Sequence, residues 1–184
     1  IFLGDTPLQD YDMTSWRHSC GVVLQDSHVF SESLARNIAV EDKHIDRTRL
    51  RTAARQANLE EFIEKLPLKY QTMVGAEGVG LSRGQEQRIF IARALYKDPS
   101  FVFLDEATNS LDANNERIIT GNLLDFCKGR TVLIVAHRLS TIRHADRIVV
   151  LHKGRIVEEG THDELCARHG YYYELINNQL IAMG

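Results

Sequence analysis

Four short apolar runs, separated by segments of helical length, decide the fold class of this chain. Each run has four to six residues, mostly Val, Ile, Leu and Phe: Cys20–Leu24, Phe101–Leu104, Thr131–Ala136 and Arg147–Leu151. Because the runs are apolar throughout rather than at alternate positions, they are typical of parallel strands that are covered on both faces. Gln85–Tyr96 and Asn114–Cys127, which lie between runs, have the length of helices. We therefore predict an α/β fold built on a parallel sheet.

Other segments modify this alternation. Ser33–Tyr70 is rich in Ala, Arg, Glu and Leu and has no strand-like run, so we predict an all-helical insertion. Lys153–Arg155 lies between two β-like runs and predicts a hairpin turn. Thr161–Glu164 has the T-x-x-E pattern of a capping box that begins a helix, and Tyr171–Leu180 predicts a closing helix. Ile1–Gly4 predicts a strand already under way, and without an initiator Met we expect a piece of a longer protein.

Composition and charge narrow the possible functions. A hydrophobic content of 43% and a charged content of 26% are ordinary for a globular domain. The formal net charge of -3 argues against a nucleic-acid partner, because there is no basic excess to neutralise phosphates. The three cysteines are not at metal-ligand spacing, which favours free thiols in a reducing compartment. No apolar run approaches the ~20 residues of a membrane span, so a membrane role requires a partner or further chain.

Three of the predicted strands end in polar residues. Gln25 and Asp26 follow the first run, Asp105 and Glu106 the second, and His137 the third. A polar residue in such a position is also expected simply because the chain leaves the core there, and an Asp often only caps the next helix. Ligands of open parallel sheets bind beyond the carboxyl ends of the strands, however, and the three sites together favour a ligand site at that edge.

Phosphoryl transfer explains these residue types. Asp105, fixed at the end of an apolar strand, suits Mg²⁺, and Gln25 offers a neutral oxygen to the same ion or to its water. Glu106 is placed to accept a proton from an attacking water. His137 is suited to donate to a γ-phosphate oxygen and to hold that water in line.

The segment Leu81–Gln85, L-S-R-G-Q, precedes a clear helix and has two interpretations. Ser82 and Gln85 form an S-x-x-Q capping box, which needs no ligand. The same helix start offers backbone N–H groups, a hydroxyl and a positive dipole end to an anion, and Gly84 permits close approach. Spacing alone leaves both interpretations open.

Taken in order, these segments resemble the nucleotide-binding domain of ATP-binding cassette transporters, and most closely the exporter branch. The resemblance covers essentially the whole chain, and the pairing of a signature with a Walker B motif about twenty residues later is highly specific. The matching motifs are the Q-loop (Val22–Asp26), the signature (Leu81–Gln85), Walker B with its catalytic glutamate (Phe101–Glu106), the D-loop (Ser110–Asp112) and the switch-histidine segment (Ala136–Ser140).

The resemblance implies a P-loop-NTPase-like parallel sheet core that lacks its N-terminal part and carries an inserted helical subdomain. It divides the chain into core (1–30), helical subdomain with the signature (31–98) and core (99–184). It also implies a partner transmembrane domain, on the same chain or another subunit, at the cytoplasmic face of the cell's inner membrane. Phe30–Leu34 and Asn37–Ala39 look like the exporter segment at that contact.

The family's two ATP molecules lie at the interface of a head-to-tail dimer of such domains. Carried over residue by residue, Gln25 and Asp105 would serve Mg²⁺, Glu106 would be the general base and His137 would contact the γ-phosphate. The signature would cap the partner's ATP, and Asp112 would couple the two sites. The signature residues carried over in this way are Leu81, Ser82, Arg83, Gly84 and Gln85.

The chain departs from the family pattern in three places. No Walker A motif, G-x-x-x-x-G-K-[ST], occurs in the sequence. Arg83 stands where the signature usually has Gly, and its side chain either crowds the partner's nucleotide or adds a cation beside it. Ala76 replaces the usual Glu of the exporter pattern T-x-V-G-E-x-G, so contact with the membrane domain is expected to differ.

Three functions fit this pattern. The first is the motor of a membrane exporter. The sequence most resembles exporters of peptides and proteins, followed by multidrug and lipid exporters. The second is a soluble ATP-binding cassette protein that acts on DNA or ribosomes, which the negative charge and the A-H-R-L-S-T segment disfavour. The third is a non-hydrolysing regulatory member, against which the presence of both Glu106 and His137 argues.

A first prediction concerns the absent phosphate loop. We expect the chain of residues 1–184 by itself to bind MgATP poorly and not to hydrolyse it, because the Walker A backbone and its Lys are the main cradle of the β- and γ-phosphates. Isothermal titration calorimetry measures this affinity. A micromolar dissociation constant would contradict the expectation.

Overall fold

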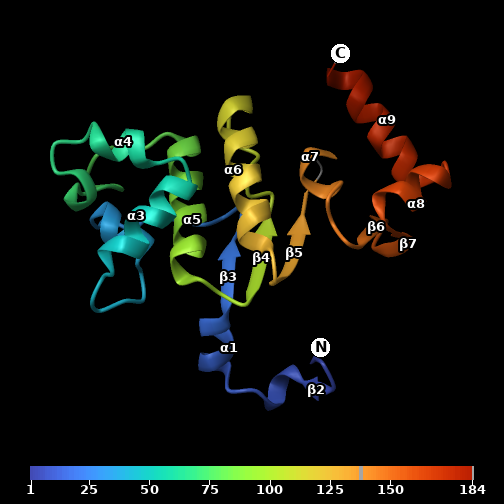
Figure 1. Ribbon diagram of the computed structural model, residues 1–184, viewed down its shortest axis with the longest axis horizontal. Helices are drawn as coiled ribbons and strands as arrows, with labels where there is room; N and C mark the ends of the chain where they lie inside the picture. Colours follow the sequence, from blue (N-terminus) through green and yellow to red (C-terminus); the bar gives the residue numbers. More distant parts are fainter. Residues whose placement is uncertain (137–138, 184) are drawn as a thin grey trace. The chain divides into compact units, whose positions relative to one another are not determined.

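The computed structural model describes residues 1–136 and 139–183 (Figure 1). It contains two compact units, Ile1–Ile134 and Val135–Gly184. Among the described residues, none of the helices combines the length and the apolar character that a bilayer crossing requires.

The first unit is built on a three-stranded sheet. Its strands are β3 (Cys20–Val23), β4 (Phe101–Asp105) and β5 (Thr131–Val135), in the order β3-β4-β5. β3 and β4 pair in parallel, and the three arrows point the same way in Figure 1. The predicted α/β fold with a parallel sheet is therefore confirmed, and each of these strands ends within one residue of its predicted boundary.

Helix α5 (Arg83–Lys97) lies at the centre of this unit. It contacts β3 on one side and the helices of the insertion on the other (Figure 1). Ile89, Ile91 and Ala92 are completely buried, and almost every residue from Ile89 to Tyr96 is buried, which is typical of a core helix. It begins at Ser82 and ends at Asp98, whose φ of 54° closes the helix in the left-handed region.

The predicted helical insertion is confirmed. It consists of α2 (Leu34–Ile38), α3 (Arg47–Gln56), α4 (Glu60–Glu64) and the 3₁₀ turn η2 (Lys69–Gln71). Ser33 and Asp46 cap α2 and α3 through side-chain oxygens that accept backbone N–H groups. The insertion packs on α5 through α2 and α3.

Asn37, completely buried in α2, holds the segment that leads into this helix. Its Oδ1 accepts the N–H of Phe30 at 2.8 Å, and its Nδ2 donates to the carbonyl of Phe30 at 2.9 Å. The same Nδ2 lies 3.3 Å from the carbonyl of Glu32 and 3.2 Å from that of Ser33. One amide therefore pairs with several main-chain groups of this loop, in addition to the isolated bridge between Ser33 and Met73.

The sheet of the first unit is covered differently from the prediction. Val23, Val102 and Leu104 are buried in the core with α5 and with α6 (Ala113–Cys127). On the opposite face, Leu133 is 59% exposed and Val135 is 54% exposed. Apolar runs therefore indicated the strands correctly, but the second face of the sheet is only partly covered in the first unit as described: Phe101 and Phe103 are half-buried, whereas the outer side chains of β5 are exposed.

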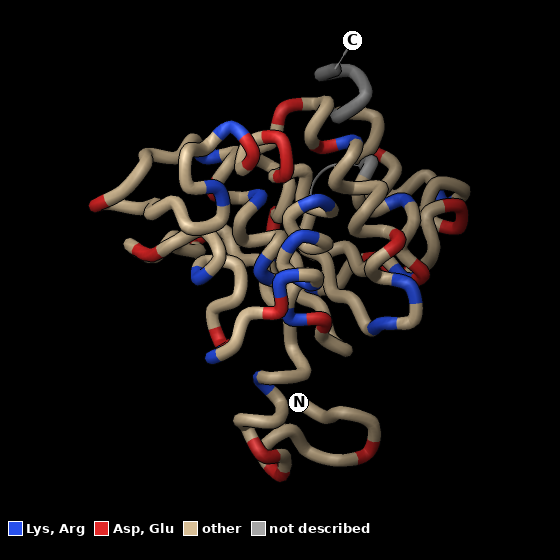
Figure 2. The backbone as a smooth tube through the Cα atoms, turned by 60° about the vertical axis from the view of Figure 1, so that its left-hand side comes forward, with Lys and Arg blue, Asp and Glu red and all other residues tan. Residues whose placement is uncertain are grey.

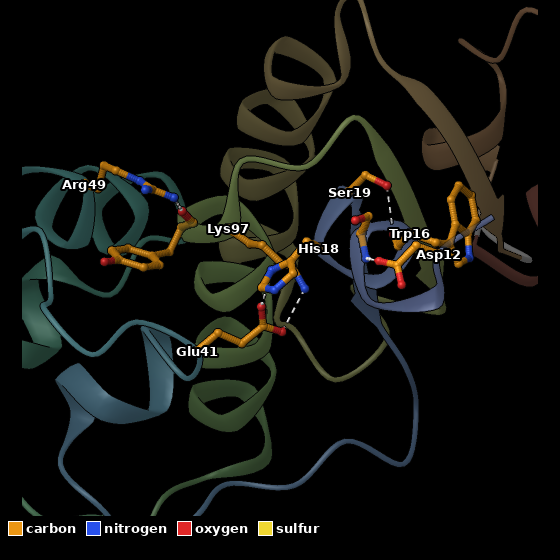
Figure 3. A network of polar contacts seen from close by, with 9 residues as sticks. Asp12, Trp16, His18, Ser19, Glu41, Arg49 and Lys97 are labelled. Atoms are coloured by element: carbon orange, nitrogen blue, oxygen red, sulfur yellow. Dashed lines mark hydrogen bonds and ion pairs between the residues drawn. The ribbon is translucent and has the colours of Figure 1, made fainter.

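A cavity of about 700 Å³ lies beside the start of β3, on the side away from the polar strand ends. Trp16, of helix α1 (Met13–Ser19), packs against Phe101 with ring centroids 4.9 Å apart. On the rim, Oε2 of Glu41 lies 3.1 Å from Nδ1 of His18, and Oε1 of Glu41 accepts from Nζ of Lys97 at 2.8 Å (Figure 3). One carboxylate thus joins α1, the loop after α2 and the end of α5.

The N-terminal segment is a small hairpin. The predicted strand at Ile1–Gly4 is only two residues long, β1 (Phe2–Leu3), and it pairs antiparallel with β2 (Thr6–Pro7). The 3₁₀ turn η1 (Leu8–Asp10) leads on to α1. Residues 1–12 carry three acidic side chains and no Lys or Arg, so this hairpin is an acidic projection of the first unit (Figure 2).

The second unit contains a hairpin and three helices among its described residues. β6 (Ile148–His152) pairs antiparallel with β7 (Arg155–Gly160), so the predicted run at 147–151 is a hairpin strand and was wrongly grouped with the parallel strands. Lys153 and Gly154 both have positive φ, 49° and 74°, as the two central residues of a type I′ hairpin turn require. The hairpin turn predicted at 153–155 is therefore confirmed.

The helices of the second unit pack on this hairpin. They are α7 (Leu139–Ile142), α8 (His162–Ala167) and α9 (Tyr171–Met183). The capping box predicted for α8 is present, with Thr161 and Glu164 each accepting the other's backbone N–H. Leu165, Tyr172 and Ile176 form a small core with the inner face of β6.

A second prediction follows from Asn37. Asn37→Ala removes the Oδ1 acceptor and the two N–H donors of Nδ2 from a site without solvent access, and we expect it to lower the free energy of unfolding by ~1–3 kcal/mol. Urea unfolding measures this change. The matched control is Asn114→Ala, at an exposed helix position, for which a change within about 0.5 kcal/mol is expected. Equal effects of the two substitutions would contradict the role of Asn37.

Candidate functional site

Two of the predicted ligand residues follow neighbouring strands. β3 and β4 pair with Val23 opposite Leu104, so Gln25 and Asp105 follow at the same edge of the sheet. Gln25 is exposed in a tight turn, whereas Asp105 is half-buried at the end of β4. His137, predicted after β5, lies outside the described residues. The structure therefore brings the two predicted oxygen ligands of Mg²⁺ to one edge.

Glu106 is held at both its main chain and its side chain. Its φ of 49° lies in the left-handed region, which residues other than Gly rarely adopt. Its carbonyl oxygen accepts from Gln87 Nε2 at 3.0 Å and from the backbone N–H of Asn109 at 3.2 Å. The side-chain amide of Asn109 also donates to Oε2 of Glu106 at 2.5 Å. The orientation of the carboxylate is thus fixed by the turn that follows β4.

The capping box predicted at the signature is present. Ser82 Oγ accepts the N–H of Gln85 at 3.3 Å, and Gln85 Oε1 accepts the N–H of Ser82 at 2.8 Å. Both side chains are therefore engaged within the helix start. In α-helical geometry the amides of the first two residues, Arg83 and Gly84, have no intrahelical acceptor, so the site keeps donors for an anion. The two interpretations of this segment are compatible.

The first turns of α5 contact the chain that follows β4. A Cβ added to Gly84 would lie 3.2 Å from the carbonyl oxygen of Ser110, so the two backbones approach closely here. Ser110 donates its N–H to Gln87 Oε1 at 2.8 Å. Nε of Arg88 donates to the carbonyl of Gly84 at 3.2 Å, and its NH1 to that of Asn58 at 2.6 Å.

Gln87 was not among the predicted site residues; in the sequence it is part of the helix that follows the signature. The spacing of Gly84, Gln87 and Arg88 places them on one face of the helix and was a usable signal. The partner of that face lies some twenty residues later in the chain, which periodicity does not reveal.

Asp112 begins α6. Its Oδ1 accepts the N–H groups of Asn114 at 3.1 Å and Asn115 at 3.0 Å, and its Oδ2 accepts Nδ2 of Asn115 at 2.5 Å. Hydrogen bonding from the backbone of Asn115 lowers the pKa of Asp112 below its ordinary value, so the carboxylate is ionised at neutral pH. Burial lowers the pKa of Arg88, and the nearby Asp112 charge partly opposes this shift.

The comparisons with known proteins agree with this geometry. Residues 1–109 match the family model described as ABC transporter. The chain is 46% identical over 175 residues to the ATP-dependent lipid A-core flippase of Chromohalobacter salexigens, covering 95% of this chain and 30% of that protein. It is 49% identical over 160 residues to the toxin RTX-I translocation ATP-binding protein of Actinobacillus pleuropneumoniae, covering 86% of this chain and 23% of that protein.

A solved structure supports the fold. It is that of a bacterial Atm1-family ABC exporter with ATP bound, which superposes with a TM-score of 0.91 at 37% sequence identity. The match covers 97% of this chain and 32% of the exporter chain. The chain thus spans about a third or less of the length of these relatives.

The chain belongs to the ABC transporter family. Its relatives are exporters, and its fold is that of the ATP-hydrolysing domain of such exporters. The family assignment made from the signature and Walker B segments is therefore confirmed. ATP hydrolysis coupled to export is the activity of this family.

A third prediction separates the two roles of Ser82. Ser82→Ala is expected to lower the free energy of unfolding by ~0.5–2 kcal/mol, because the N-cap is lost, whereas Ser82→Asp keeps the cap and leaves stability nearly unchanged. Urea unfolding of the chain measures both. In a transporter carrying the domain, Ser82→Asp is nevertheless expected to lose ATP turnover, because its charge repels a bound phosphate. Full turnover in this variant would show that Ser82 acts only as a cap.

Proposed function

We propose that this chain is the motor domain of a membrane exporter, in which MgATP hydrolysis drives substrate across the membrane. The observation that carries this proposal is Glu106, a carboxylate fixed directly after the Walker B strand by bonds to its carbonyl and to Oε2. Such a fixed carboxylate suits a general base, which must be aimed at its water before the reaction. The exporter names of the relatives favour the motor over a soluble or regulatory member of the family.

The residues present suit the ligands of such a motor. The carboxylate of Asp105 and the amide oxygen of Gln25 are hard donors of the kind that Mg²⁺ prefers, and they follow adjacent strands. In this proposal bound Mg²⁺ neutralises the developing phosphate charge. Glu106 takes the proton of the attacking water, and His137 contacts the γ-phosphate. Asp112 couples the two sites of a dimer.

The signature serves a second copy of the domain in this proposal. Two domains pair head to tail, and the helix start at Leu81–Gln85 caps the ATP bound to the partner. The first-turn amides and the positive end of α5 supply the donors. Arg83, which is exposed at the first helical position, adds a cation beside that phosphate.

The partner of the helical region is proposed to be a transmembrane domain, with the motor at the cytoplasmic face of the inner membrane. The division of the chain into core (1–30), helical subdomain (31–98) and core (99–184) is part of this proposal. The exporter-like segment Phe30–Leu34 is kept in shape by Asn37, and the side chain of Phe30 is 49% exposed. A preshaped loop with an exposed aromatic residue suits contact with another domain.

The transported substrate is proposed to be a peptide or protein. The toxin-translocation protein, at 49% identity, supports this substrate class. Export of lipid is the second candidate, since lipid A-core flippases are similar to the chain over a larger share of its length. Stimulation of ATPase activity in the reconstituted transporter by unfolded polypeptide rather than by lipid A would favour the first.

A fourth prediction tests the general base. In the full-length transporter that carries this domain, Glu106→Gln keeps the size of the side chain and an oxygen that can accept from Asn109. It removes the carboxylate that would take up the proton. We expect turnover to fall by about a hundredfold or more, which is the usual contribution of a general base, while nucleotide binding is retained. Phosphate release measures turnover, and binding of a fluorescent ATP analogue measures affinity. Unchanged turnover would refute the assignment of Glu106.

A further inference from the structure

The first two turns of α5 present one polar side chain to two motifs at once. Gln87 donates from Nε2 to the carbonyl of Glu106 at 3.0 Å and accepts the N–H of Ser110 at Oε1, at 2.8 Å. The first contact lies at the residue of the candidate base, and the second lies at the start of the D-loop. A single amide therefore spans the turn between them.

The turn itself depends on an external support. Glu106 has a left-handed backbone that an unsupported Glu seldom adopts. Within the turn, the backbone N–H of Asn109 also reaches the carbonyl of Glu106, at 3.2 Å. Gln87 adds a shorter bond to the same carbonyl from a helix whose next turns are buried in the core. The hydrogen bond from Gln87 therefore holds the carbonyl of Glu106 in place relative to α5.

The start of α5 lies close to the chain that follows β4 at two further residues. A Cβ added to Gly84, one turn before Gln87, would lie 3.2 Å from the carbonyl oxygen of Ser110. Arg88 lies on the same side of the helix, and its NH1 is 3.4 Å from Oδ1 of Asn115 in the first turn of α6. The start of α5 and the segment from 106 to 115 therefore form one packed contact.

We propose that Gln87 is a positioning residue that ties the signature helix to the general base of the same chain. This inference rests on the proposed function, in which the signature caps the partner's ATP and Glu106 serves its own. A movement of α5 on contact with the partner's phosphate is passed through the Gln87 amide to the carbonyl of Glu106 and the N–H of Ser110. The base is aligned only when the neighbouring site is capped.

The chemistry of the side chain makes this role specific. The side-chain amide combines an NH₂ group that donates with an oxygen that accepts, and these match a carbonyl and a backbone N–H. Gln87→Glu keeps the acceptor for Ser110 but sets a carboxylate against the carbonyl of Glu106. Gln87→Leu keeps the approximate volume and removes both bonds. Glu86→Gln, at the neighbouring position of the same helix, serves as the matched control.

The test uses the full-length transporter reconstituted in lipid, with ATP turnover, KM for ATP and thermal unfolding measured for each variant. For a positioning role we expect kcat to fall about tenfold or more in Gln87→Leu and less in Gln87→Glu, with KM within about twofold of wild type. Glu86→Gln is expected to keep wild-type kcat. A residue that only supported the fold would instead lower the unfolding temperature and leave the kcat of the folded fraction unchanged.

The outcomes separate this inference from the function on which it rests. Wild-type kcat in both Gln87 variants, alongside loss of turnover in Glu106→Gln, would overturn the positioning role and keep the motor. Wild-type kcat in Glu106→Gln would overturn the assigned base and the positioning role with it. If Gln87→Leu fails to fold, Gln87→Glu decides the question, since it retains the bond from Ser110.

Discussion

Helix α5 is buried on most of its surface, and its packing joins the two layers of the first unit. β3 contacts one side of the helix, and α2 and α3 contact the other. Its middle turns carry completely buried Ile and Ala side chains and are anchored in the core, whereas the residues of its first two turns, Arg83–Arg88, are half-buried or exposed. The core therefore sets where the helix lies relative to the sheet, and the signature at its start lies on its less buried end.

This packing also explains why the elements were predictable. The apolar runs of β3, β4 and β5 and the length of α5 carry their own signal, since burial selects those residue types. Two predictions made from composition were wrong. β6 was grouped with the parallel strands, although the hairpin turn at Lys153 and Gly154, which was itself predicted, pairs it antiparallel with β7. The exposed face of β5 shows that an apolar residue marks a strand without revealing what covers it.

The candidate site divides in the same way. Asp105, Glu106 and the capping box of Ser82 were predictable because each depends on neighbours within a few residues. The contacts of Gln87 with Glu106 and Ser110 were not, because they join segments 19 and 23 residues apart through side-chain geometry. Contacts between near neighbours can be predicted from the order of the residues, whereas the support of the turn at Glu106 arises only when a buried helix is brought against it.

The left-handed backbone of Glu106 restricts which side chains this position tolerates, whatever their chemistry. At a φ of 49° a β-branched residue such as Val or Thr is strained, whereas Gly and Asn adopt this region readily. A β-branched substitution would displace the turn that leads to Ser110 and Asp112 as well as remove the carboxylate. Relatives that replace the glutamate at this position are therefore expected to have an unbranched side chain or Gly there. The backbone, rather than the reaction, sets the limits of their divergence.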